Sequence, residues 1–290
     1  MNDIHDIIGT DYRSINLKPI NKRIRNRRIK AEMRQPDVAL IITSKNKKYK
    51  LLKVEDSNNR RYLHIRKMLD LLSAFDFVPR IIWSDDHKIL VEYIDGKYPD
   101  FGVELFAREI GKHLSKLHSI NVGTIDADDY FLKIEKNLEY LVSKKALSFK
   151  RKSILTKKLS DLKPDVLRTS MVYANMHNPK NYVFSKDNKL YFIDLGSFQV
   201  DRVTDDVLFG YRIFKSLDEN TFWESYFKNG GTNYIYDNRL FLKLAQHINK
   251  AAKHLHGHHK KPVYDLWQKR RSYKRFQWMR NELIAEMDNF

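Results

Sequence analysis

Two side chains with oxygen donors, Asn181 and Asp194, stand at the two ends of a short predicted hairpin. The hairpin follows an apolar strand and a polar loop, and it ends in Asp194-Leu195-Gly196. Since each residue lies at a strand end, both side chains could converge on one cation. A carboxylate with an amide suits magnesium that is held partly by phosphates, and Gly196 lets the backbone turn away at once. A polar turn with a capping aspartate is the alternative, and the spacing alone leaves it open.

The N-terminal part, which precedes this hairpin, is predicted to be rich in β-strands. Short apolar runs bounded by polar turns are typical of strands, and a longer run with apolar residues three and four apart is typical of a helix. On this pattern we expect strands over residues 15–33, 37–43, 48–55, 80–83 and 88–93, and a helix over residues 58–74.

The chain beyond residue 96 is predicted to be mainly helical, with the Asn181–Asp194 hairpin as a β island. We expect helices over residues 100–118, 128–162, 205–228, 236–256 and 263–288, and island strands over residues 170–173, 181–184 and 189–194. The predicted fold class is therefore α+β with two lobes, a small β-rich lobe (1–95) and a larger helical lobe (96–290). Ligands often bind in a crevice between such lobes.

Composition excludes several classes of protein. The chain has 290 residues and no cysteine, which excludes disulfide scaffolds, cysteine-based metal sites and thiol nucleophiles. No apolar run is long enough to span a bilayer, and the polar, acidic N-terminus does not resemble a secretory signal. We therefore expect a cytoplasmic protein without a transmembrane segment.

The formal charge of +18 lies mostly at the two ends of the chain. Residues 1–52 carry 13 basic and 5 acidic side chains, and residues 243–290 carry 11 basic and 4 acidic ones. Two solvated, lysine-rich faces would explain this distribution of charge. One anion-binding surface built from both ends of the chain would explain it too, and the basic run 22–30 supports that alternative. No recognisable nucleic-acid-binding motif accompanies the charge, so nucleic acid is an unlikely partner. Peripheral contact with the anionic inner face of a membrane is an alternative.

Residues 35–215 resemble the protein-kinase-like superfamily, in particular its aminoglycoside phosphotransferase, choline kinase and lipopolysaccharide core kinase branch. The resemblance rests on the Asp194-Leu195-Gly196 motif with Asn181 before it, and on the two-lobe pattern. It implies a kinase-like fold with ATP and magnesium as cofactors, and it assigns the metal to Asn181 and Asp194. It also assigns the nucleotide phosphates to Lys53, on a predicted strand, and the adenine to the hinge Glu92-Tyr93-Ile94.

Three departures from the family pattern limit this resemblance. Asn175 stands where the catalytic aspartate is expected, and an amide cannot accept a proton at neutral pH. His177, in the same loop, is an alternative group for proton transfer. The chain has no glycine between Gly9 and Gly96, so the glycine-rich phosphate loop is absent. Residues 56–91 contain no glutamate to pair with the strand lysine, and Asp70 is the only stand-in that we identify.

The resemblance implies transfer of the γ-phosphoryl group of ATP to a hydroxyl of a small molecule or glycan. The basic charge and the hinge favour an anionic acceptor, such as the lipopolysaccharide core or another envelope sugar. Losing a general base typically costs about 10²–10⁴-fold in rate, so Asn175 alone predicts a slow enzyme. The alternative is a pseudokinase, a binding or scaffolding module without catalysis. A basic RNA-associated module is a third hypothesis, which would require salt-sensitive RNA binding.

Overall fold

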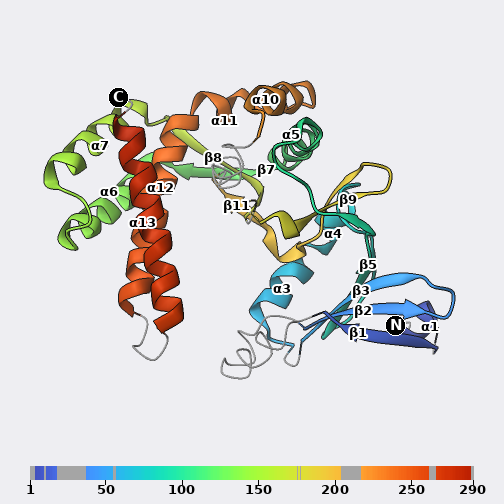
Figure 1. The fold of residues 1–290 in the computed structure, drawn as a ribbon. Helices are drawn as coiled ribbons and strands as arrows, with labels where there is room; N and C mark the ends of the chain where they lie inside the picture. Colours follow the sequence, from blue (N-terminus) through green and yellow to red (C-terminus); the bar gives the residue numbers. More distant parts are fainter. Residues whose placement is uncertain are drawn as a thin grey trace. The chain divides into compact units, whose positions relative to one another are not determined.

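The computed structural model describes residues 4–9, 11–17, 37–54, 57–174, 176, 178–203, 217–260 and 266–288 (Figure 1). The chain divides into two compact units, one made of Met1–Ile110 and Asn178–Gln199, the other of Gly111–His177 and Val200–Phe290. An antiparallel sheet followed by a mainly helical region confirms the predicted α+β class. The lobe boundary near residue 95 stays a prediction.

A five-stranded antiparallel sheet dominates the first unit, with the strand order β1-β2-β3-β5-β4. Its strands are β1 (Tyr12–Asn16), β2 (Asp37–Thr43), β3 (Lys48–Lys53), β4 (Ile81–Ser84) and β5 (Lys88–Glu92). The predicted turn between β2 and β3 contains Asn46 at φ 57°, a left-handed conformation that asparagine tolerates. The register pairs Lys50 with Leu40 on one side and with Val91 on the other, so β3 is an inner strand.

One face of this sheet packs against the short helix α1 (Ile4–Ile8). Ile4 and Ile8 form a buried cluster with Ala39, Leu51 and Leu90, which are strand residues. Since side chains alternate along a strand, Lys50 and Leu52 point to the opposite face from Leu51. Helix α3 (Arg60–Lys67) is capped by Asn59, whose side chain accepts a hydrogen bond from the Tyr62 amide. Helix α4 (Leu69–Ser73) follows it.

The Asn181–Asp194 hairpin belongs to the first unit. Its strands, β9 (Tyr182–Ser185) and β10 (Leu190–Phe192), form a small sheet with β6 (Gly96–Lys97). The ring of Tyr182, which is fully buried, lies edge-on to Phe192 at 5.1 Å and to Phe106 at 5.5 Å. The amide of Phe192 donates to the Phe77 carbonyl at 2.9 Å. These contacts fix the end of β10, from which the chain continues to Asp194.

The second unit is mainly helical. Its elements are β7 (Asn121–Asp126), α6 (Ala127–Ser143), α7 (Phe149–Leu162), β8 (Val166–Tyr173), α10 (Glu219–Lys228), α11 (Asn233–Asp237), α12 (Arg239–Lys260) and α13 (Leu266–Asp288). Helix α5 (Glu104–His118) and strand β11 (Phe198–Arg202) span the division between the units. The helical region predicted over residues 128–162 consists of two helices, α6 and α7, because Lys145 adopts φ 54° and Ser148 caps a new helix.

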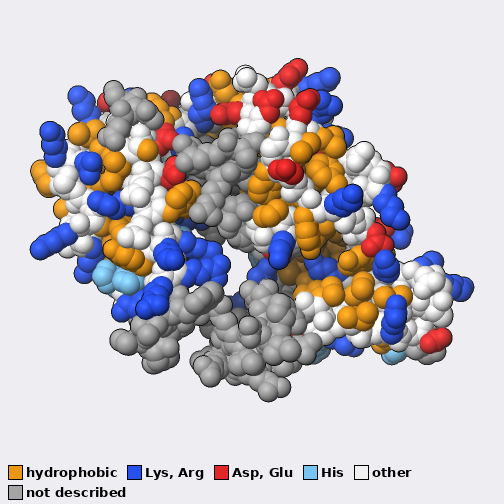
Figure 2. All heavy atoms as spheres, viewed as in Figure 1, with side chains coloured by type: hydrophobic (Ala, Val, Ile, Leu, Met, Phe, Trp, Pro, Cys, Tyr) orange, Lys and Arg blue, Asp and Glu red, His pale blue; other side chains and the backbone are white. Residues whose placement is uncertain are grey.

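On the face that Figure 2 draws, lysine and arginine side chains lie at many places on the described surface. The basic run 22–30 and most of the predicted strand 15–33 lie outside the described residues, as does the start of the predicted helix 205–228. The hypothesis of one anion-binding surface from both ends therefore stays a prediction. None of the helices in the described part of the chain has both the length and the apolar character of a membrane span.

Candidate functional site

Lys50, from the middle of β3, is the lysine that reaches the hairpin. Its Nζ donates to the carbonyl oxygen of Ile193 at 2.8 Å, across 143 residues of sequence. The amide of Ile193 in turn donates to the carbonyl of Asn181 at 2.8 Å. Ile193 thus connects the strand lysine, the residue before β9 and, through its next peptide bond, Asp194.

Lys53, the lysine that the family resemblance assigned to the phosphates, lies at the end of the same strand. Its side chain is exposed, and its backbone pairs with Asp37 and Lys88. Because the two lysines are three residues apart in a strand, they point to opposite faces of the sheet. Only the face of Lys50 meets Ile193.

Asp194 is held by Arg61 and Ser197. Nη2 of Arg61, in the first turn of α3, lies 3.1 Å from Oδ1 of Asp194 and 3.4 Å from Oδ2. The Ser197 hydroxyl, which is fully buried, donates to Oδ2 at 2.8 Å. The Arg61 guanidinium packs directly on Gly196, where an added Cβ would lie 2.6 Å from Nε. The absence of a side chain at Gly196 therefore allows this close approach.

Asn181 is buried at the end of a short 3-10 turn, Pro179–Asn181. Its Oδ1 accepts a hydrogen bond from Nδ2 of Asn178 at 2.9 Å, and its backbone carbonyl accepts from Ile193. The hairpin therefore brings the backbone of Asn181 next to the residue that precedes Asp194. Convergence of the Asn181 and Asp194 side chains on one cation stays a prediction.

The electrostatics of the site are those of one carboxylate among two cations. Burial lowers the pKa of Lys50, the charge of Asp194 opposes this effect, and the charge of Arg61 reinforces it. Asp194 and Arg61 keep 29% and 38% of their side chains exposed, so the pair can still exchange with solvent or ligand. With Lys50, the three charged groups sum to a net positive site, which favours an anion.

The predicted hinge begins at the last residue of β5 and passes the first residue of β3. The Glu92 amide donates to the Arg80 carbonyl at 2.9 Å, and the Tyr93 amide faces the Lys48 carbonyl at 3.4 Å. Lys48 also pairs with Asp95 at 2.7 Å. Glu92, Tyr93 and Ile94 are all half-buried. Their assignment to adenine stays a prediction.

The loop after β8 carries the two residues expected to act on the acceptor. Asn175 and His177 lie outside the described residues. Their described neighbours, Tyr173 and Met176, are buried, and Asn178 is exposed. The assignment of proton transfer or acceptor positioning to this loop therefore stays a prediction.

The helix glutamate of the family has no counterpart among the described residues of α3 and α4. Arg61 is the α3 residue that reaches the site, and Asp70 is exposed in α4. A search of the sequence for glutamate shows that the helix glutamate is missing, but it does not show which residue lies in its place. The sequence reasoning identified neither Lys50 nor Arg61, which the structure places against Ile193 and Asp194. Lys50 and Lys53 are an odd number of residues apart in a strand, so their side chains lie on opposite faces and only one of them could face the hairpin.

The donors of the site fit a magnesium ion in type. Asp194 supplies carboxylate oxygens and Asn181 an amide oxygen, which are ligands that a hard cation accepts. The structure also shows that Arg61 already pairs with Asp194, so a cation would have to displace this guanidinium. No cluster of three or more histidine, aspartate or glutamate side chains suited to a metal occurs within the described ranges. Phosphate oxygens would have to complete the coordination.

Comparison with solved structures identifies the fold. Macrolide 2'-phosphotransferase MphH from Brachybacterium faecium aligns with a TM-score of 0.62 at 12% identity, covering 92% of each chain. Choline kinase LicA from Streptococcus pneumoniae aligns with a TM-score of 0.55 at 16% identity, covering 94% of this chain and 97% of that one. The ADP-bound aminoglycoside phosphotransferase APH(2'')-Ib gives 0.53 at 16%, covering 93% and 94%.

The chain therefore has the α+β protein-kinase-like fold of these small-molecule phosphotransferases, as predicted. No protein-family model matches the sequence, and no curated protein matches it. The resemblance to lipopolysaccharide core kinases, in particular, stays a prediction.

Proposed function

We propose that this chain binds ATP and transfers its γ-phosphoryl group to a hydroxyl of a small molecule or glycan. The observation that carries the proposal is the contact of Lys50 with the Ile193 carbonyl, directly before Asp194. A cation from the sheet and a carboxylate from the hairpin thereby lie together, on a fold shared with small-molecule kinases. Phosphoryl transfer depends mainly on this kind of positioning and charge stabilisation.

In this proposal Lys50 and Arg61 contact the phosphate oxygens of the nucleotide. The acceptor hydroxyl oxygen forms a bond to the γ-phosphorus, and the bond from that phosphorus to the bridging oxygen of ADP breaks. The hydroxyl proton leaves to water or to His177, since the amide of Asn175 can orient the hydroxyl but cannot accept the proton. Magnesium, held by Asp194 and Asn181, would neutralise charge on the phosphates.

The acceptor class follows from the charge of the chain. A formal charge of +18 favours an anionic acceptor, for which an envelope sugar or lipid-linked glycan at the inner face of a membrane is our candidate. Macrolides and choline, named for the similar structures, are not strongly anionic. Because the proposal requires ATP, it also requires a cytoplasmic location.

A radiolabelled γ-phosphate assay tests this function. The purified chain is incubated with labelled ATP, magnesium and a panel of choline, macrolide, aminoglycoside and phosphorylated glycan acceptors, and label in the acceptor is measured. We expect Asp194→Ala to abolish transfer, whereas Asp187→Ala retains it, because Asp187 is an exposed carboxylate in the turn of the same hairpin. Full activity of Asp194→Ala would refute the proposal, as would the absence of transfer to every acceptor.

A second function, nucleotide binding without transfer, is favoured by the Arg61–Asp194 pair. An arginine that neutralises the metal-binding aspartate can stabilise the fold and hold phosphates without a metal. Such a pseudokinase would show a rise in melting temperature with ATP by mass action. It would release no labelled phosphate with any acceptor.

A further inference from the structure

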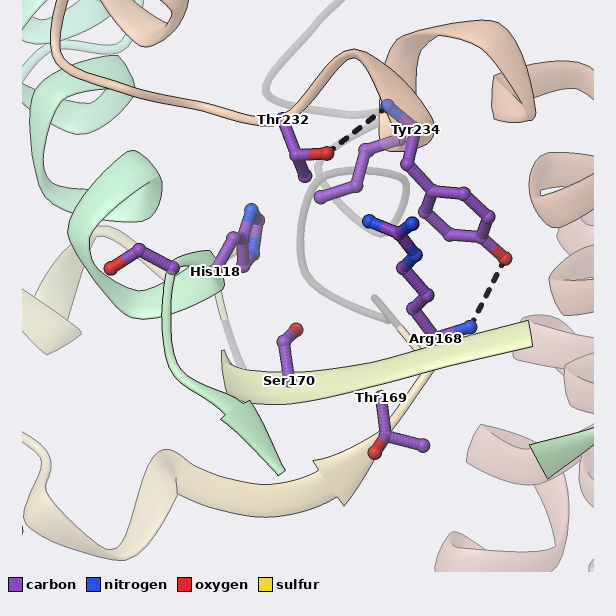
Figure 3. A pocket seen from close by; sticks show the side chains of 8 residues that line it. His118, Arg168, Thr169, Ser170, Thr232 and Tyr234 are labelled. Carbon is purple, nitrogen blue, oxygen red and sulfur yellow. Dashed lines mark hydrogen bonds between the residues drawn. The ribbon is translucent and has the colours of Figure 1, made fainter. Parts of the chain in front are cut away.

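A small pocket lies within the second unit, between the end of α5, strand β8 and the start of α11 (Figure 3). Its volume is about 170 Å³, below the roughly 300–1,000 Å³ of typical drug-sized sites. The side chains that line it include His118, Arg168, Ser170 and Thr232. None of its lining residues belongs to the Lys50–Asp194 site.

Among the described residues, the pocket is lined by hydrogen-bond donors and by no carboxylate. Its eight lining residues comprise one arginine, one histidine, four serines or threonines, one tyrosine and one isoleucine. Figure 3 shows Arg168 and Ser170 on the same side of β8, with His118 and Thr232 facing that side, whereas Thr169 points the other way. A small pocket with this lining suits an anion.

Arg168 is held in a defined position. Its guanidinium lies over the Tyr234 ring, 5.4 Å from the ring centre, while its backbone amide donates to the Tyr234 hydroxyl at 3.2 Å. That hydroxyl donates to the Val166 carbonyl at 3.0 Å. The N–H groups of a guanidinium lie in its own plane and can donate from it to an oxyanion. No carboxylate in the described part of the chain pairs with Arg168.

Ser170 gives the second, independent observation. Its hydroxyl is buried and has no hydrogen-bond partner among the described residues, although it lines the pocket. A buried hydroxyl without a partner is unfavourable, and native proteins usually satisfy such groups. A ligand oxygen in the pocket would accept this hydrogen bond.

We infer that this pocket binds a small tetrahedral oxyanion, a phosphate group that is either free or the end group of a small molecule. Arg168 supplies the charge and a planar pair of N–H donors, and the Ser170 hydroxyl supplies a buried donor. The Thr232 hydroxyl, which already accepts from the Tyr234 amide at 3.2 Å, can donate its own hydrogen to the same ligand.

Titration calorimetry at constant ionic strength tests the inference with inorganic phosphate, sulfate, glycerol 3-phosphate and acetate. We expect saturable binding of phosphate and sulfate, weaker binding of acetate, and loss of phosphate affinity by about tenfold or more in Arg168→Gln. Ser170→Ala should weaken phosphate binding without lowering the unfolding temperature, because it removes a hydroxyl that lacks a partner. If glycerol 3-phosphate binds more tightly than phosphate, the natural ligand carries an end group; equal affinity points to the free ion.

Two variants separate this pocket from other sources of charge. Arg239 also lies over a tyrosine ring, Tyr236, at 4.0 Å, but it does not line the pocket, so Arg239→Gln should keep phosphate affinity. Lys50→Gln should keep it too, because Lys50 belongs to the proposed nucleotide site. The inference is overturned if phosphate does not bind saturably. It is also overturned if Arg239→Gln or Lys50→Gln loses as much affinity as Arg168→Gln. The phosphate affinities measured for this pocket do not test phosphotransfer at Asp194.

Discussion

The guanidinium of Arg61 lies 3.1 Å from the carboxylate of Asp194, so a helix residue and the candidate metal ligand are paired directly. In the kinase-like pattern a helix glutamate is expected to pair with the strand lysine instead. Here the helix supplies a positive charge to the aspartate, and Lys50 interacts with the same aspartate from the sheet. The site therefore gains one cation and loses one anion relative to the expected arrangement.

The first prediction concerns the two lysines of β3. Lys50→Ala should weaken ATP binding by about tenfold to a hundredfold, since hydrogen bonds to charged groups contribute roughly 1.5–3 kcal/mol. Lys53→Ala should leave it within about twofold, because Lys53 is exposed on the other face. Calorimetric titration with ATP measures both variants. A larger loss in Lys53→Ala than in Lys50→Ala would restore the original assignment.

The second prediction concerns competition between Arg61 and magnesium. In Arg61→Gln the magnesium concentration that half-saturates ATP-dependent thermal stabilisation should fall by about twofold to fivefold, because a half-exposed ion pair contributes at most about 1 kcal/mol. Arg66→Gln is the matched control, since Arg66 lies on the same helix and pairs with Asp86. A higher magnesium requirement in Arg61→Gln would contradict competition between this guanidinium and the metal for Asp194.

The third prediction concerns acid stability in the second unit. Burial lowers the pKa of His247 to about 4, Lys243 adds to this effect, and Glu286 and Glu282 oppose it. The unfolded chain, with the ordinary value of 6.5, therefore binds more protons, and stability falls as the pH drops from 6.5 towards 4. This effect should reach about 3 kcal/mol at pH 4.

Urea unfolding at pH 7 and pH 4 measures this effect. His247→Gln should lose less stability between the two pH values than the parent chain does. His87→Gln, which changes an exposed histidine in the turn before β5, should behave like the parent. An equal loss in all three proteins would show that other groups cause the acid sensitivity.

The fourth prediction concerns the small sheet that carries Asp194. A Cβ on Gly96 would lie 1.9 Å from the backbone oxygen of Phe184, so Gly96→Ala should push β6 and β9 apart. We expect a loss of about 1–3 kcal/mol in the free energy of unfolding. In Gly257→Ala, within α12, the nearest atom is 3.8 Å away, and stability should stay equal or rise by up to about 1 kcal/mol. Equal effects in both variants would contradict the close packing at Gly96.

The sequence predicted the fold class because strand and helix periods are local properties. The turn before Lys48 and the hairpin with Asn181 and Asp194 follow from apolar runs that polar residues interrupt. The position of the break between α6 and α7 cannot be read from the sequence, because its left-handed residue, Lys145, is not a glycine.

The details of the site were harder to predict because they depend on which face of an element is buried. Lys50 and Lys53 have equal claims in the sequence, and only the packing of Leu51 against α1 separates them. Arg61 could not be found at all, since its role depends on Gly196, which lies far along the chain and allows the guanidinium to approach.

The return of residues 178–199 to the first unit has a consequence for biosynthesis. Lys50 and Ile193 are separated by 143 residues, so a ribosome that adds roughly 5–20 residues per second needs about 7–30 seconds between them. During this interval Lys50 in the nascent sheet has no Ile193 carbonyl to bind, and Arg61 in helix α3 has no Asp194 to pair with. The candidate site of Lys50, Arg61 and Asp194 therefore cannot form until most of the chain has been synthesised, and a fragment ending at residue 110 would lack it.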